Sequence, residues 1–167
     1  MTSRYAALSK NDIVNGEGIC VSFWVQGCPH HCEGCFNPET WDFEGGKSLP
    51  ADIKDQIAEA IIDNGIERNF SVLGGEPLCE ENRDLVDELI TFVRARFPHI
   101  KIYLWTGYIA EDLFNSTDSV IKSILDKIDF LIDGPFIEKK RNLALKLRGS
   151  FNQRVFQNIE GNWKVLY

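Results

Sequence analysis

Three of the five cysteines in this 167-residue chain lie within eight residues, in the stretch GCPHHCEGCFN at residues 27–37. They are Cys28, Cys32 and Cys35, spaced as C-x3-C-x2-C. Thiolates bind soft metals such as zinc and the iron of iron-sulfur clusters. A structural zinc site uses four protein ligands, whereas a cubane cluster held by three thiolates leaves its fourth iron open. The spacing therefore indicates a metal centre and raises the question of a fourth ligand.

Zinc is the alternative to an iron-sulfur cluster. Cys3His zinc sites are common, and the candidate fourth ligands in this chain are His30, His31, Cys20 and Cys79. Zinc modules more often split their ligands into two separated pairs, whereas these three cysteines share one loop. The spacing favours a cluster and leaves zinc as a second interpretation.

A glycine-rich motif, Gly74-Gly75-Glu76-Pro77, comes later in the chain, directly after a short apolar segment. Glycines let backbone carbonyls approach a ligand closely, and a glutamate can accept a hydrogen bond from an ammonium group. The same residues could form a tight turn in which Pro77 begins a helix. The presence of a metal-binding loop upstream favours a ligand-binding role.

The motifs alternate with segments that predict strands and helices. Apolar runs rich in β-branched and aromatic residues predict strands at residues 19–25, 70–73, 100–105 and 130–132. Apolar residues at every third or fourth position predict helices at residues 51–64, 85–97 and 120–128. Each polar or glycine-rich motif follows a strand. Because sites of β/α folds form at the carboxyl ends of parallel strands, we expect the motifs to converge on one pocket.

This alternation predicts an α/β fold in a single domain that spans residues 1–167. A complete eight-fold barrel takes about 250 residues, so we expect an incomplete, open (β/α) barrel. The C-terminal stretch VFQNIEGNWKVLY predicts a β-hairpin, with its turn at residues 160–162. The open side of the barrel would leave room for a large substrate or a partner protein.

Composition excludes several function classes. The formal charge of −7 and the pI near 5.0 argue against nonspecific nucleic-acid binding, which requires clustered Lys and Arg. No apolar run approaches the ~18 residues of a membrane span, and the N-terminus lacks the apolar core of a signal peptide. We expect a cytoplasmic protein with neither nucleic-acid nor membrane partners, in which the cysteines stay reduced.

Six motifs together resemble those of the radical S-adenosylmethionine (SAM) enzymes, whose signature is a C-x3-C-x2-C loop. In chain order they are DIVNG at 12–16, the cysteine loop, GGEP at 74–77, WTGY at 105–108, DGPF at 133–136 and RGSFNQ at 148–153. The set covers nearly the whole chain and is most similar to activators of anaerobic ribonucleotide reductase. Two positions depart from the pattern: Glu76 stands where some relatives have Asp, and Cys79 where His is expected.

The resemblance implies a barrel of the radical SAM type and two cofactors, a 4Fe-4S cluster and SAM. The implied cluster ligands, which are also the catalytic residues, are Cys28, Cys32 and Cys35. The implied contacts of SAM are Gly34, Cys35, Phe36, Asn37, Gly74, Gly75 and Glu76. The implied reaction is reductive cleavage of SAM, after which a 5'-deoxyadenosyl radical abstracts hydrogen from a glycine.

The implied partners are the large subunit of anaerobic ribonucleotide reductase, which carries that glycine, and a low-potential electron donor. Three other functions stay open at this point: a radical SAM enzyme acting on a small molecule, an activase of another glycyl-radical enzyme, and a zinc-stabilised interaction module.

Overall fold

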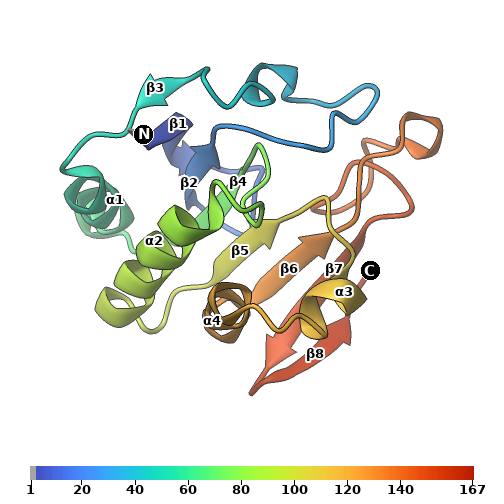
Figure 1. The fold of residues 1–167 in the computed structure, drawn as a ribbon. Helices are drawn as coiled ribbons and strands as arrows, with labels where there is room; N and C mark the ends of the chain where they lie inside the picture. The colour runs from blue at the N-terminus through green and yellow to red at the C-terminus, as the bar shows by residue number, and fades with distance from the viewer. Residues whose placement is uncertain (1–2) are drawn as a thin grey trace.

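The computed structural model describes residues 3–167, which form a mixed α/β fold on one eight-stranded sheet (Figure 1). The strand order is β3-β1-β2-β4-β5-β6-β7-β8. The strands are β1 (Arg4–Asp12), β2 (Cys20–Val25), β3 (Lys47–Ser48), β4 (Asn69–Gly74), β5 (Ile102–Trp105), β6 (Phe130–Asp133), β7 (Arg154–Ile159) and β8 (Asn162–Val165). The helices are α1 (Ile53–Ile61), α2 (Arg83–Arg96), α3 (Ala110–Phe114) and α4 (Ser119–Lys127), with 3-10 turns η1 (Pro38–Thr40), η2 (Asp63–Gly65) and η3 (Glu138–Lys140).

The centre of the sheet is parallel, as the sequence predicts. Strands β2, β4, β5 and β6 pair in parallel. The chain returns between them through α1, through α2, and through α3 with α4. This confirms the predicted α/β fold class. Because parallel neighbours end at the same edge, the loops after all four strands lie at one end of the sheet.

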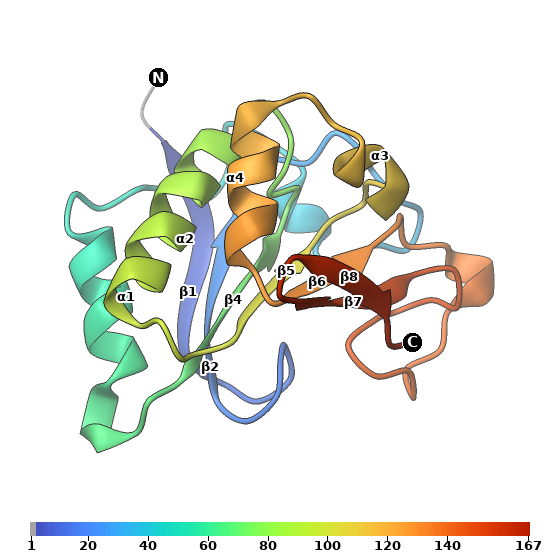
Figure 2. The same cartoon turned by 90° about the horizontal axis from the view of Figure 1, so that it is seen from below.

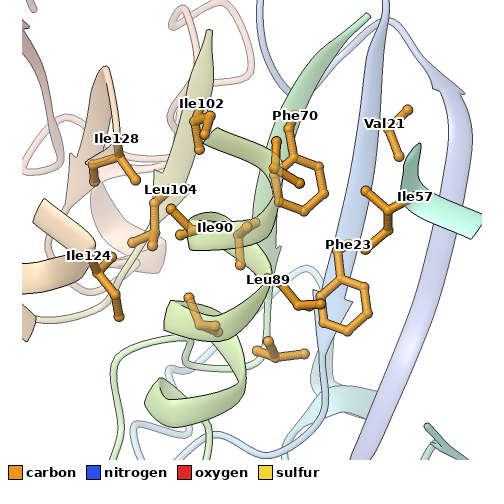
Figure 3. Close-up of a cluster of buried hydrophobic side chains, with 14 of the residues drawn as sticks. Val21, Phe23, Ile57, Phe70, Leu89, Ile90, Ile102, Leu104, Ile124 and Ile128 are labelled. Atoms are coloured by element: carbon orange, nitrogen blue, oxygen red, sulfur yellow. The ribbon is translucent and has the colours of Figure 1, made fainter. Parts of the chain in front are cut away.

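Helices α1, α2 and α4 cover one face of the sheet (Figures 1 and 2). The side chains between these layers are apolar and fully or almost fully buried. Figure 3 shows part of this core, with strand residues such as Phe23, Phe70 and Leu104 facing helix residues such as Leu89 and Ile124. Burial of each such side chain stabilises the fold by about 1.5–3 kcal/mol. Among residues 3–167 no helix has the length and apolar character needed to cross a membrane.

Antiparallel strands extend the sheet on both sides. β1, a strand that the sequence patterns do not predict, pairs with β2, and β7 pairs with β6. The sequence RYAALSKND of β1 is poor in strand-forming residues, so pairing with β2 has to stabilise this strand. The predicted C-terminal hairpin is confirmed, since β7 and β8 pair antiparallel around a turn at Glu160 and Gly161.

The helix predicted at residues 51–64 is shorter in the structure, where α1 ends at Ile61. Asn64 and Gly65 adopt positive φ angles of 56° and 71°, which an α-helix does not allow. The buried guanidinium of Arg68 donates hydrogen bonds to the carbonyls of Ala60, Asp63 and Ile66 around this bend. Arg68 therefore satisfies backbone groups that the helix leaves unpaired.

Candidate functional site

The loops after β2, β4, β5 and β6 line one cavity of about 390 Å³. This volume lies within the range of about 300–1,000 Å³ that is usual for small-molecule sites. The cavity is lined by eight of the nine predicted site residues: Cys28, Cys32, Cys35, Phe36, Asn37, Gly74, Gly75 and Glu76. The exception is Gly34, whose Cα faces the side chain of Glu138. The expected convergence of the motifs is confirmed, and their contacts with a cluster or SAM stay a prediction.

Backbone hydrogen bonds hold the cysteine loop closed at its base. The N–H of Gly27 donates to the carbonyl of Thr40 over 2.8 Å, and the N–H of Cys28 donates to that of Trp41 over 3.1 Å. The amide of Gln26, which is only 3% exposed, donates to two further carbonyls of the same segment, over 3.0 and 2.7 Å. The three thiols are therefore presented by a braced loop.

The donor set of the loop fits an iron-sulfur cluster. The three loop cysteines are free, partly exposed thiols that line the cavity. Burial, opposed by nearby backbone N–H groups and reinforced by the charge of Glu76, raises the pKa of the Cys28 thiol above its usual value. Metal ligation needs the thiolate, so a bound metal has to displace this proton. The N–H of Asn37 points at Sγ of Cys35 over 3.4 Å, a contact of the kind that tunes cluster potentials.

Within residues 3–167, no three His, Cys, Asp or Glu side chains are grouped so that they could hold one metal ion. A single zinc ion requires all its ligands within about 2.0–2.3 Å of one point. In a cubane cluster each thiolate binds a different iron, so the thiolates do not have to converge on one atom.

The four candidate fourth ligands for zinc all have other contacts. Cys20 and Cys79 are buried, and their thiols donate to the carbonyls of Glu17 and Glu76, over 3.7 and 3.1 Å. Burial raises the pKa of the Cys79 thiol to about 12, which opposes the thiolate that a metal would need. His31 stacks on Trp41 with ring centroids 4.7 Å apart. His30 contacts a buried carboxylate through its Nε2.

That carboxylate belongs to Glu76, which is 1% exposed and joins three loops. Its Oε1 accepts from the N–H of Leu78 over 2.9 Å and from the hydroxyl of Thr106 over 2.7 Å. Its Oε2 accepts from Nε2 of His30 over 2.8 Å and from the N–H of Gly107 over 2.7 Å. Each oxygen thus has two protein donors. The carboxylate that we expected to meet an ammonium group is already engaged in holding the cavity walls together.

The glycine-rich turn packs directly against the base of the cysteine loop. The N–H of Glu76 and the side-chain amide of Asn82 both donate to the carbonyl of Gly27, over 2.9 and 3.1 Å. A Cβ at Gly75 would lie 2.2 Å from this carbonyl oxygen, far inside van der Waals contact. Gly75 is therefore required for the close approach of the two loops, in addition to any role at a ligand.

The segment after β6 forms a further wall of the cavity. The rings of Phe36 and Phe136 lie 4.9 Å apart, and a Cβ at Gly149 would meet the Phe36 ring at 2.6 Å. The indole N–H of Trp105 donates to the carbonyl of Leu147 over 2.7 Å and fixes this wall on the sheet. Arg148 is the lining residue from this wall that carries a permanent charge.

Comparison with known proteins shows the family to which the chain belongs. A family profile described as "4Fe-4S single cluster domain" matches residues 14–156. Three similar proteins carry the name anaerobic ribonucleoside-triphosphate reductase-activating protein. The one from Enterobacteria phage T4 is 37% identical over 155 residues, which are 92% of this chain and 93% of that protein. The Vibrio cholerae protein is 36% identical over a region that covers 85% of this chain and 90% of that protein. The Escherichia coli K12 protein is also 36% identical, over 86% of this chain and 92% of that protein. The chain belongs to this family of reductase-activating proteins.

Membership in the activating-protein family supports an iron-sulfur cluster over zinc, because the matched domain is described by its 4Fe-4S cluster. Several residues of the site were not predicted from the sequence, among them His30 as a partner of Glu76 and Trp41, Leu143, Leu145 and Leu147 as lining residues. His30 and Glu76 are 46 positions apart, so no local spacing connects them. Asp133, the first residue of the DGPF motif, is outside the cavity lining and pairs with Arg154 over 2.6 Å.

Proposed function

We propose that this protein activates an anaerobic ribonucleoside-triphosphate reductase by generating a glycyl radical on it. The observation that supports this function most directly is that three loop thiols and a glycine-rich turn line one cavity in a chain of the activating-protein family. The cofactors would be a 4Fe-4S cluster and SAM. The fold would then be an incomplete (β/α) barrel of the radical SAM type, with the parallel strands β2, β4, β5 and β6 forming its wall.

In this proposal Cys28, Cys32 and Cys35 hold the cluster. When bound, the cluster supplies one low-potential electron, which breaks the bond from sulfur to C5' in SAM and yields methionine and a 5'-deoxyadenosyl radical. That electron comes from a low-potential donor. The radical then takes one hydrogen atom from a glycine Cα, which gives 5'-deoxyadenosine and a glycyl radical. The five free thiols fit a reducing cytoplasm as the place of this reaction.

The protein's own residues bind and orient the reactants. Gly74 and Gly75 bring the backbone close to the cavity, where carbonyls can accept from the ammonium group of SAM. Phe36 and Asn37 follow the third cysteine and offer an aromatic face and an amide to the adenine and ribose. Glu76 acts as a positioning residue, because its four acceptor positions are used by protein donors.

The substrate would be a backbone glycine in a loop of the reductase. A glycine presents its Cα hydrogen with no side chain in the way, so it can enter a narrow cavity. Hydrogen transfer requires the reacting atoms to approach to about 3–3.5 Å, so the partner has to close over the cavity mouth. Without the partner we expect slow SAM cleavage and no productive hydrogen transfer.

An isotope experiment tests the proposal. The reconstituted protein, SAM and a reductase carrying α-deuterated glycine are mixed anaerobically with dithionite. We expect a glycyl doublet in the electron paramagnetic resonance spectrum and deuterium in 5'-deoxyadenosine. Deuterium retained in the reductase while a small metabolite loses hydrogen would replace the proposal with a small-molecule radical enzyme. Label transfer from the glycine of a different glycyl-radical enzyme, and none from the reductase, would change the partner.

A further inference from the structure

Residues 136–151, here called the basic loop, connect β6 to β7 and lie beside the cysteine loop (Figure 1, the orange segment after β6). Three contacts join the two loops. The rings of Phe36 and Phe136 are 4.9 Å apart, the guanidinium of Arg141 lies 5.2 Å from the centroid of Phe36, and Gly34 abuts the side chain of Glu138. The basic loop therefore borders the mouth of the proposed cofactor cavity.

The basic loop has the opposite charge to the rest of the chain. It contains five Lys or Arg and one Glu, a formal charge of +4, whereas the whole chain carries −7, so the remainder carries −11. Lys139 and Lys140 are exposed, and neither makes an ion pair within residues 3–167. A local cluster of one sign attracts a partner segment of the other sign and raises the rate of encounter.

The mouth next to these charges is apolar. Leu143 is 75% exposed and also lines the cavity, together with Leu145 and Leu147 of the same loop. Val14 and Phe36, which are 75% and 49% exposed, line the cavity from other loops. Exposed apolar side chains gathered around a cavity are typical of a surface that another molecule covers.

The basic loop is also fixed in place rather than loosely attached. Its two arms are joined by an antiparallel bridge between Arg141 and Ser150 and by the N–H of Asn142, which donates to the carbonyl of Gly149 over 3.0 Å. The hydrogen bond from the indole N–H of Trp105 to the carbonyl of Leu147 anchors the second arm of the loop on β5. Because the loop is already ordered, less conformational entropy is lost when a partner binds to it.

We propose that the basic loop is the docking surface for the reductase, and that it binds an acidic segment next to the glycine-bearing loop. This inference rests on the proposed function. Lys139 and Lys140 would attract the acidic residues, while apolar residues of the incoming loop cover Leu143 and Phe36. The occupant is assigned to the reductase because the same loop lines the cavity that the glycine has to enter.

A pair of charge-reversal variants tests this surface. Lys139→Glu with Lys140→Glu reverses the charge of the basic loop at two residues outside the cavity lining. The matched control is Lys101→Glu with Lys122→Glu, two exposed residues without ion pairs in the described chain, one before β5 and one on α4. Each protein is reconstituted with its cluster, and reductase binding and glycyl-radical yield are measured with dithionite as reductant.

We expect the loop variant to bind the reductase roughly tenfold more weakly at low salt, and the control to bind like the unaltered protein. The difference should shrink in 1 M salt, where the Debye length falls to about 3 Å. SAM cleavage without the reductase should be unchanged in both variants. Equal reductase binding by the loop variant and the control would overturn the inference.

The electron donor is the rival occupant of this surface. Radical formation that is slowed only when a donor protein replaces dithionite, with reductase binding unchanged, would assign the loop to the donor and overturn the inference. An unaltered protein that binds the reductase but yields no glycyl radical would instead overturn the proposed function. The two failures are therefore distinguished by different measurements, binding in one case and the radical signal in the other.

Discussion

Replacing Glu76 should destabilise the protein in proportion to the hydrogen bonds that the new side chain cannot make. Glu76→Ala removes the acceptor for four donors, of which the N–H of Leu78 and the hydroxyl of Thr106 belong to residues that are 1% and 5% exposed. Leaving a buried donor unpaired costs about 1–3 kcal/mol, so these two alone amount to about 2–6 kcal/mol. Native stability is typically about 5–15 kcal/mol, so the loss is large.

Glu76→Gln should cost less, because the amide keeps one acceptor oxygen. Its NH₂ group, itself a donor, then faces the N–H of Gly107 or of Leu78, which loses its acceptor. We expect the free energy of unfolding to fall by about 1–3 kcal/mol. The matched control is the exposed Glu80, where substitution by Ala or Gln should change stability by less than about 0.5 kcal/mol. Anaerobic urea denaturation of all five proteins measures these differences.

SAM binding to the same variants separates the two roles of Glu76. If the carboxylate positions the walls, SAM affinity and unfolding free energy should fall together in the order unaltered, Gln, Ala. If the carboxylate instead bound the ammonium group directly, Glu76→Gln would weaken SAM binding roughly ten- to a hundredfold with stability unchanged. That second pattern, or a Glu76→Ala protein as stable as Glu80→Ala, would refute the positioning role.

Three further substitutions have definite expected outcomes. Cys32→Ala should prevent assembly of a full cluster, and iron and sulfide analysis with absorption spectra would detect a cluster that still forms. Gly75→Ala should lower the urea midpoint clearly, since the new Cβ would lie 2.2 Å from the carbonyl oxygen of Gly27; an unchanged midpoint would show that the loops move apart freely. The hydrogen bonds from Arg154 lower the pKa of Glu111 to about 2, so this pair stabilises the fold above pH 4.5, and the contribution disappears as the pH falls towards 2. The stability difference between the unaltered protein and Glu111→Gln should therefore narrow over that range, and a constant difference would contradict the assignment.

The sequence predicted those features that local patterns encode. The four central strands and the helices that cover them follow from apolar periodicity, and the structure confirms their order. The convergence of the loops follows from the parallel arrangement, because each motif comes after a strand. The spacing of Cys28, Cys32 and Cys35 indicated a metal loop without any knowledge of the fold. These inferences needed only residues that are close together in the chain.

Features that depend on distant partners were missed. Strand β1 forms because β2 offers a pairing edge, and its own composition gives little sign of a strand. From the sequence we predicted that Glu76 binds a ligand, because the neighbouring residues do not indicate which protein groups donate hydrogen bonds to its carboxylate. The N–H of Leu78 is two positions away, but the other three donors come from His30, Thr106 and Gly107, which lie 46, 30 and 31 positions away.

Because Glu76 is buried, the glycine-rich motif has a structural role in addition to any contact with a ligand. A buried carboxylate is strongly disfavoured unless hydrogen-bond donors surround it. The native fold therefore requires the donors of three loops to stay at fixed positions around Glu76. One of these loops carries the cysteines, and the other two, after β4 and β5, also line the cavity. Any shift of the cysteine loop relative to β4 would have to break the contact between His30 and Glu76. We infer that the geometry between the thiols and the glycine-rich turn is set before any cofactor binds, which is what a reaction dependent on close alignment requires.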